Sequence, residues 1–355
     1  MEIRRPNWLP DYIPELQGLR GIAILAVVVY HCHPRLEGTP FHGPALWGWA
    51  GVNLFFVLSG FLITSILLEA REAPHYFRNF YGRRALRIWP VYALVLLVCL
   101  AFPDWFLSED LSGLHGPGPW LACLLLLQNL FHFALPSAIG PMWSLAIEEQ
   151  YYFVWAPLVR WLRRPWMLAA MLALAMTASP ALRLSHFPWL TRTHTQMHLD
   201  GIAWGSLLAL ALHTLGLSQR AWLWLGLGGM LAGFAAAGTI AGGTAFLDSA
   251  LAVGFAGAVV AAIASTGRPV NALLRRGPLP FLGRISYGLY MTHIFVFIYF
   301  GWFDLRMNAF GVAGNLAVVA VRLLASTLVA TALWYGFESR ILRLKRVFVG
   351  RGFRV

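Results

Sequence analysis

The chain has 355 residues, of which 59% are hydrophobic and only 12% are charged, and its formal net charge is +12. A soluble domain is typically about 25% charged, so this composition excludes a water-soluble protein and indicates one embedded in a lipid bilayer. The positive charge does not indicate a nucleic-acid partner, because the basic residues are spread over several loops and form no basic face on a soluble module.

The apolar residues gather in runs that approach the roughly 20 residues a helix needs to cross a bilayer. The expected spans are residues 19–33, 46–68, 88–103, 119–137, 143–162, 166–182, 199–215, 221–240, 247–265, 281–301 and 313–336. The pattern predicts an all-α fold, a polytopic transmembrane helical bundle that forms one domain over residues 1–355. No cleavable signal peptide is expected, because the first residues are polar and the first apolar run continues into a candidate motif.

Arginine-rich connections predict the orientation, since basic residues favour the cytoplasmic side of a membrane. Such residues gather in 69–87, in 266–284 and in the tail 339–355, whereas 104–118 contains acidic residues and no Lys or Arg. Both termini are therefore expected in the cytoplasm, with 1–15 as a short cytoplasmic segment.

The number of apolar runs conflicts with this orientation, because eleven full crossings cannot place both termini on one side. We therefore expect about ten crossings plus one re-entrant or tilted segment between residues 119 and 162. The favoured segment is 143–162, which Glu148, Glu149 and Gln150 interrupt. Polar groups at membrane depth are tolerated mainly where they line a cavity.

The first span carries an arginine and a histidine on one face. Arg20 and His31 are eleven residues apart, so their side chains point the same way at positions about 16 Å apart along the helix. Arginine binds phosphate in bidentate fashion, and histidine acts as a general base near neutral pH. The pair suits a cofactor with an anionic head and a long reactive arm. The alternative is a snorkelling arginine and a histidine that caps the helix. His33 is a second candidate base, although it points about 200° away.

The next two spans add a hydroxyl group and a basic pair. Ser59 and Gly60 lie in mid-span, where the serine offers a hydroxyl, although small-residue packing explains the two residues as well. Arg84 and Arg87 share a helix face where a cytoplasmic phosphate would arrive. Anchoring at the cytoplasmic surface explains this arginine pair equally well.

Two later stretches place polar groups inside apolar runs. Glu148 and its neighbour Glu149 are costly there unless they are paired or solvated. A carboxylate at this position is expected to orient a catalytic histidine or to pair with an arginine; a structural ion pair between helices is the alternative. Tyr287, Tyr290 and His293 recur every three residues and predict one polar stripe. No cysteine spacing typical of a metal site appears, so no metal is expected.

In chain order, these blocks resemble the acyltransferase-3 family of bacterial membrane acyltransferases. The matching blocks are 16–31, 51–62, 84–92, 143–152, 286–293 and Glu338. The resemblance implies that His31 is the catalytic histidine and that Arg20 completes the family's arginine–histidine pattern. It implies that Arg84 and Arg87 handle acyl-CoA, and that Glu148 is the acidic residue of the family's Trp-Ser-Leu block. Ser59, Asn53, Tyr287, Tyr290 and His293 are further candidate site residues.

The resemblance also implies a donor, an acceptor and a location. The donor is cytoplasmic acyl-CoA, above all acetyl-CoA, used as a substrate and not as a permanently bound cofactor. The acceptor is a hydroxyl group, commonly of a cell-envelope glycan on the extracytoplasmic side of the bacterial inner membrane. Many relatives carry an esterase-like extracytoplasmic domain that is not expected here. The chain is therefore expected to transfer directly or to pass the acyl group to a separate periplasmic transferase.

Three positions depart from the family pattern. Gln17 and Asn53 stand where relatives often have aspartate, and His198 replaces a frequent arginine ahead of Asp200. The handling of the acceptor is therefore expected to differ from that of relatives.

The expected chemistry is O-acyl transfer, in which His31 removes a proton from the acceptor hydroxyl and the oxygen attacks the thioester. A relay through an acyl-histidine or acyl-tyrosine is equally compatible with the sequence. The alternative function is a transporter of a lipid-linked or amphipathic substrate, although no repeated halves are visible. A non-catalytic membrane partner of an assembly complex is a third interpretation.

Overall fold

The computed structural model describes residues 5–102, 116–131, 137–185, 187, 189–240 and 245–348. The principal helices are α1 (Pro14–His31), α2 (His42–Leu46), α3 (Ala50–Glu69), α4 (Tyr76–Ala101), α5 (Pro117–Leu124), α6 (Trp143–Trp161), α7 (Pro165–Ser185), α8 (Leu199–Thr214), α9 (Gln219–Thr239), α10 (Leu247–Ala264), α11 (Ala272–Arg275), α12 (Pro278–Tyr299), α13 (Gly301–Met307), α14 (Gly311–Leu333) and α15 (Ser339–Leu342). The described residues form helices and no strand, which confirms the all-α prediction.

Among the described residues, seven helical stretches are long and apolar enough to cross a membrane. The expected count of about ten crossings is not confirmed. The sequence-based boundaries agree closely with several helices, as for the expected span 247–265 and α10 (Leu247–Ala264). The acidic connection 104–118 and the end of the basic tail lie largely outside the described residues.

The region 119–162, which was expected to contain one re-entrant or tilted segment, forms two helices of different length. Over the favoured stretch 143–162, α6 is a continuous helix of 19 residues, and it is not among the seven candidate membrane spans of the described residues. The short element is α5, whose 8 residues are far fewer than the roughly 20 needed to span. Leu126 follows it in the left-handed backbone region, at φ 55°, which ends the helix. Each polar side chain of α6 has an environment that accommodates it: Glu148 lines a cavity, Glu149 pairs with Arg84, and Gln150 donates to Leu126 O.

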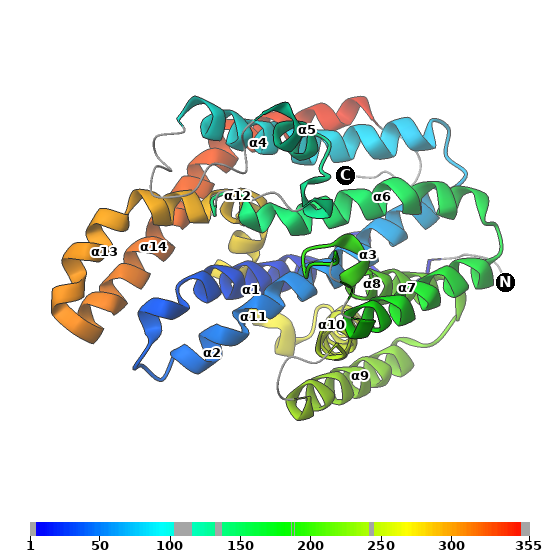
Figure 1. Ribbon diagram of the computed structural model, residues 1–355. Coiled ribbons are helices and arrows are strands. Elements are labelled where there is room, and N and C mark those ends of the chain that lie inside the picture. Colours follow the sequence, from blue (N-terminus) through cyan, green and yellow to red (C-terminus); the bar gives the residue numbers. More distant parts are fainter. Residues whose placement is uncertain are drawn as a thin grey trace.

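The centre of the bundle is formed by α1, which packs against α12 and α3, and by α3, which also packs against α8 (Figure 1). Glycines permit these close approaches. A Cβ atom on Gly283 would collide with the backbone of Gln17 in α1, and one on Gly60 would collide with Ile202 in α8. Gly60 therefore serves helix packing, as one interpretation of the Ser59–Gly60 pair predicted.

The outer helices differ from the central ones in burial. Only 22% of the apolar stretch of α7 and of α9 is buried, against 67% of the stretches that contain α3 and α10. Exposed leucine, phenylalanine and tryptophan side chains lie along α4, α7 and α9. In a membrane protein this pattern indicates lipid-facing surfaces around a packed centre, which holds the polar residues discussed next.

Candidate active site

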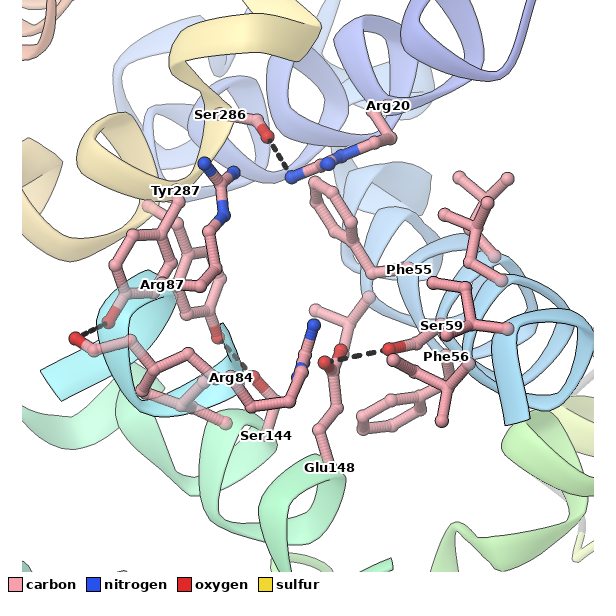
Figure 2. A pocket seen from close by; sticks show the side chains of 18 residues that line it. Arg20, Phe55, Phe56, Ser59, Arg84, Arg87, Ser144, Glu148, Ser286 and Tyr287 are labelled. Atoms are coloured by element: carbon pink, nitrogen blue, oxygen red, sulfur yellow. Dashed lines mark hydrogen bonds between the residues drawn. The ribbon is translucent and has the colours of Figure 1, made fainter. Parts of the chain in front are cut away.

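Two cavities in the described part of the chain bring the candidate residues together. The first, which we call the arginine cavity, has a volume of ≈ 240 Å³ and lies between α1, α3, α4, α6 and α12 (Figure 2). The second, the histidine cavity, is larger at ≈ 980 Å³. Val52 and Tyr290 line both cavities, so the two spaces meet at these side chains.

The arginine cavity takes its name from Arg20, Arg84 and Arg87, which all line it, as the sequence predicted for a shared site. Arg84 pairs with Glu149 at 3.3 Å, and Arg87 pairs with Glu338 at 2.7 Å. Both arginines project from one side of α4, since they are three residues apart. Each of them is therefore charge-balanced by a carboxylate from another helix.

Arg20 differs from the other two arginines. Its Nη2 donates to Ser286 Oγ at 2.9 Å, and no ion pair joins its guanidinium group to a carboxylate of the described residues. Glu148 and Glu338 attract Arg20 without forming an ion pair with it, and a cation inside an apolar bundle is costly without a direct partner. Its position at the cavity wall, with Glu148 on the opposite side of the opening in Figure 2, leaves donors available to an anionic ligand.

Glu148 lies in the arginine cavity, where two hydroxyl groups hold it. Ser59 Oγ donates to Glu148 Oε2 at 2.8 Å, and Tyr152 OH donates to the same oxygen at 2.6 Å. The expected contact between Glu148 and His31 is not found among the described residues, because His31 lines the other cavity. In this structure Glu148 therefore does not orient the histidine directly.

His31 lines the histidine cavity, and its neighbour is His293. His31 Nδ1 lies 2.8 Å from Val27 O and 3.4 Å from His293 Nε2. A carbonyl oxygen only accepts, so in the neutral ring Nδ1 carries the hydrogen and Nε2 is left as the base. His293 Nδ1 is 2.8 Å from Tyr290 O, which by the same argument leaves His293 Nε2 as an acceptor facing His31.

The alternative base, His33, does not line either cavity. Its Nδ1 lies 2.7 Å from Tyr30 O, and its ring stacks on Tyr30 at a centroid distance of 5.2 Å. The geometry thus favours His31 over His33 as the histidine available to a ligand.

The stripe predicted on α12 is divided between the cavities. Tyr287 lines the arginine cavity, and its hydroxyl donates to Ile88 O at 2.7 Å. Tyr290, at the junction, lies 2.6 Å from Ser144 Oγ and donates to Pro141 O at 2.5 Å. His293 is fully buried beside His31. The three side chains therefore serve different sites along one helix.

The histidine cavity contains polar residues that the sequence analysis missed. Asn53, which it did select, donates from Nδ2 to Asp248 Oδ1 at 3.1 Å. Asp248 lies 3.6 Å from Arg183, and Arg183 pairs with the buried Asp200 at 2.6 Å. Arg183 and Asp248 lie at the ends of apolar runs. Glu148 was selected because charges inside a membrane are costly, and the same rule would have found these two residues.

Aromatic rings complete the wall of this cavity. Tyr30, Trp49 and Trp143 line it together with His198, and the rings of Trp143 and His198 lie 4.9 Å apart. Aromatic faces beside hydrogen-bonding groups suit a ligand that is polar at its edges and apolar on its faces.

These features define a helical membrane protein with adjoining buried polar sites, one cationic and one containing histidine. A family model described as an acyltransferase domain matches residues 13–335, and the chain belongs to this acyltransferase-3 family. The family predicted from the sequence is therefore confirmed.

Several curated proteins are similar to parts of the chain. Peptidoglycan O-acetyltransferase OatA of Listeria monocytogenes is 33% identical over 181 residues, which cover 46% of this chain and 28% of that protein. Putative peptidoglycan O-acetyltransferase YrhL of Bacillus subtilis is 38% identical over 156 residues, 41% of this chain and 23% of that protein. O-acetyltransferase OatA of Staphylococcus aureus is 33% identical over 162 residues, 42% of this chain and 25% of that protein.

The matched segments thus span less than a third of the length of each of these relatives. No solved structure matches the chain.

Proposed function

We propose that this protein is an O-acyltransferase of the bacterial inner membrane. It transfers an acyl group, which we take to be acetyl, from cytoplasmic acyl-CoA to a hydroxyl group of a cell-envelope glycan. The observation that carries the proposal is the pair of cavities that meet at Val52 and Tyr290, one lined by arginines and the other by His31. A donor that joins an anionic head to a reactive thioester needs a cationic site for the head and a base near the thioester.

The donor enters through the arginine cavity. Arginine side chains bind phosphate strongly and with defined geometry, and Arg20 has donors that no described carboxylate neutralises. At ≈ 240 Å³ this cavity is smaller than the roughly 300–1,000 Å³ typical of pockets for drug-sized ligands. The slender pantetheine arm would occupy it and extend past Tyr290, so that the thioester reaches the neighbourhood of His31.

The acceptor occupies the histidine cavity. This space is about four times larger than the first, from ≈ 980 and ≈ 240 Å³, and it combines aromatic rings with Asn53 and Asp248. Sugars present hydroxyl edges and apolar faces, which such walls complement. The names of relatives that act as peptidoglycan O-acetyltransferases support a glycan acceptor for this chain as well.

The transfer uses His31 Nε2 as the base. It removes the proton of the acceptor hydroxyl while the oxygen attacks the thioester carbonyl, and the carbon–sulfur bond then breaks. The thiolate of CoA takes the proton from the imidazolium and leaves as the free thiol. His293 accepts from His31 Nδ1–H and so stabilises the imidazolium. Glu148 helps to balance the positive charge of the arginine cavity.

Two routes share these residues, direct transfer and a relay through an acyl-histidine. Rapid quenching with labelled acetyl-CoA in the absence of acceptor separates them, because only the relay leaves label on the protein. In the relay, His31 Nε2 attacks the thioester itself, and the acceptor hydroxyl later displaces the acyl group from it.

The test of the proposal is release of CoA from acetyl-CoA by purified protein in nanodiscs, with envelope extract as the acceptor. Wild type is expected to release CoA, and the His31→Ala variant is expected not to do so. Full activity in His31→Ala would refute the assigned base. Failure of the wild type to bind or turn over acetyl-CoA would instead favour a transporter.

A further inference from the structure

The last described segment of the chain folds back onto the start of α4. The helices and turns after Leu333 run beside α4 (Figure 1). Arg83 Nη1 donates to Phe348 O at 3.3 Å, and the Arg78 guanidinium lies 5.9 Å from the centre of the Phe348 ring. The ring occupies the space left by Gly82, where a Cβ atom would collide with it. The segment is therefore docked on α4.

Docking brings Lys345 to the arginines of α4. Lys345 is the one lysine in the sequence, and it interacts electrostatically with Arg83, Arg84 and Arg87. It is half-buried, whereas Arg343 and Arg346 on the same turn are exposed. Within the described residues, no hydrogen bond or ion pair engages its ammonium group.

This arrangement concentrates positive charge at one place. Arg84 and Arg87 are paired with Glu149 and Glu338. Glu338 also attracts Lys345, so among these groups two carboxylates face four cations, Arg83, Arg84, Arg87 and Lys345. Like charges held together repel each other, and the repulsion is relieved when an anion binds between them. The site therefore suits a ligand with several negative charges.

We propose that Lys345 and Arg83 bind the phosphate groups at the nucleotide end of the acyl donor, and that the segment 339–348 forms one wall of this phosphate subsite. The inference rests on the proposed function and extends it from the acyl arm to the other end of the donor. The arginine cavity is too small for a nucleotide as well as the arm. The nucleotide must lie outside this cavity, and the docked tail supplies cations next to Arg84 and Arg87.

The test compares two donors that share a thioester and differ in phosphates: acetyl-CoA and S-acetyl-pantetheine. In nanodiscs, Lys345→Gln is expected to raise the KM for acetyl-CoA about tenfold, because the variant loses one charge-assisted hydrogen bond to the donor. It is expected to leave the KM for S-acetyl-pantetheine unchanged. Arg346→Gln is the matched control, because it removes a charge from the same turn without touching the cluster, and it is expected to match wild type with both donors.

A second variant tests the docking itself. Gly82→Leu places a side chain where the Phe348 ring lies and should displace the tail, with the same selective rise in KM for acetyl-CoA. Unchanged kinetics with S-acetyl-pantetheine show that either variant is folded.

Each outcome bears on a different claim. Equal KM values for acetyl-CoA in wild type and Lys345→Gln would overturn the phosphate subsite and leave the acyltransferase proposal intact. A parallel loss with both donors would also overturn the subsite, because the tail would then be acting on the whole site. Turnover of neither donor by wild type would refute the proposed function together with this inference.

Discussion

The two cavities differ in the kind of polar side chains that line them. In the arginine cavity, charges come from α1, α4 and α6, and most are paired with carboxylates. His31 lines the histidine cavity, and the ring of the buried His293 lies beside it. The carbonyl contacts of these two imidazole rings assign a neutral tautomer to each. A bilayer tolerates permanent charges only in partnership, whereas a neutral base can remain without a partner until substrate arrives. Under the proposed function, this difference separates donor binding from base chemistry along the helices, and the following predictions test that separation.

The largest expected effect comes from the base. His31→Ala should lower kcat by about 10³-fold, within the range for loss of a general base, and leave the affinity for CoA unchanged. CoA release in nanodiscs measures both quantities. His33→Ala is the matched control, because His33 stacks on Tyr30 outside both cavities, and it should retain nearly full activity.

Arg20 should govern binding of the donor. Arg20→Gln removes a guanidinium group that has no described carboxylate partner, so folding stability should change little. The Kd for CoA should rise about 10-fold to 100-fold, the value of one or two charge-assisted contacts. Calorimetric titration with CoA measures it. A fall in kcat with unchanged Kd would contradict a binding role.

Arg87 lines the same cavity, but its loss should destabilise the protein. The Glu338 side chain that it pairs with is only 2% exposed. Arg87→Gln leaves that carboxylate buried and unpaired, at a cost of about 3–5 kcal/mol. Thermal unfolding of the protein in detergent should show a large decrease in Tm. The double variant with Glu338→Gln should recover much of this loss, and an undiminished loss would argue against the pair.

His293 should act through His31 and not on the substrate. His293→Phe removes the acceptor that faces His31 Nδ1–H, so kcat should fall about tenfold, the value of one hydrogen bond to a charged group. The pH at which activity is half-maximal should move down, because the imidazolium of His31 loses a stabilising contact and gives up its proton more readily. The KM should not change. An unchanged pH profile would indicate a purely structural role.

The smallest expected effect concerns the acceptor. Asn53→Ala loses the hydrogen bond to Asp248, which should cost about 1 kcal/mol of stability. It should raise the KM for acceptor a few-fold and leave the KM for acetyl-CoA unchanged. Steady-state kinetics with each substrate varied in turn separate the two effects. A change in the donor KM would mean that the cavities are not separate.

The sequence located candidate site residues more closely than it located the membrane spans. Arg20 and His31 were expected on one face of the first helix to serve one ligand, and in the structure they line two cavities that share Val52 and Tyr290. Their roles stay predictions. The stripe on α12 was expected to form one group. Each step of three residues falls about 60° short of a full turn and rises about 4.5 Å. Tyr287 therefore lines the arginine cavity, whereas His293 is buried beside His31.

Other features depend on tertiary packing, which no local pattern contains. The partners of Glu148 come from α3 and its own helix, and nothing in the spacing of residues identifies them. The apolar character of residues 119–137 favoured a span, but the backbone turns at Leu126 after a short helix. In contrast, Arg183 and Asp248 could have been selected from the sequence, because charges beside apolar runs require partners.

The central claim, that donor binding and base chemistry occupy separate cavities, is tested most directly by titrating CoA into three proteins in nanodiscs: wild type, His31→Ala and Arg20→Gln. The account predicts that His31→Ala binds CoA as tightly as wild type although it does not turn over acetyl-CoA, and that Arg20→Gln binds CoA at least about tenfold more weakly. Loss of CoA binding in His31→Ala, or wild-type affinity in Arg20→Gln, would contradict it.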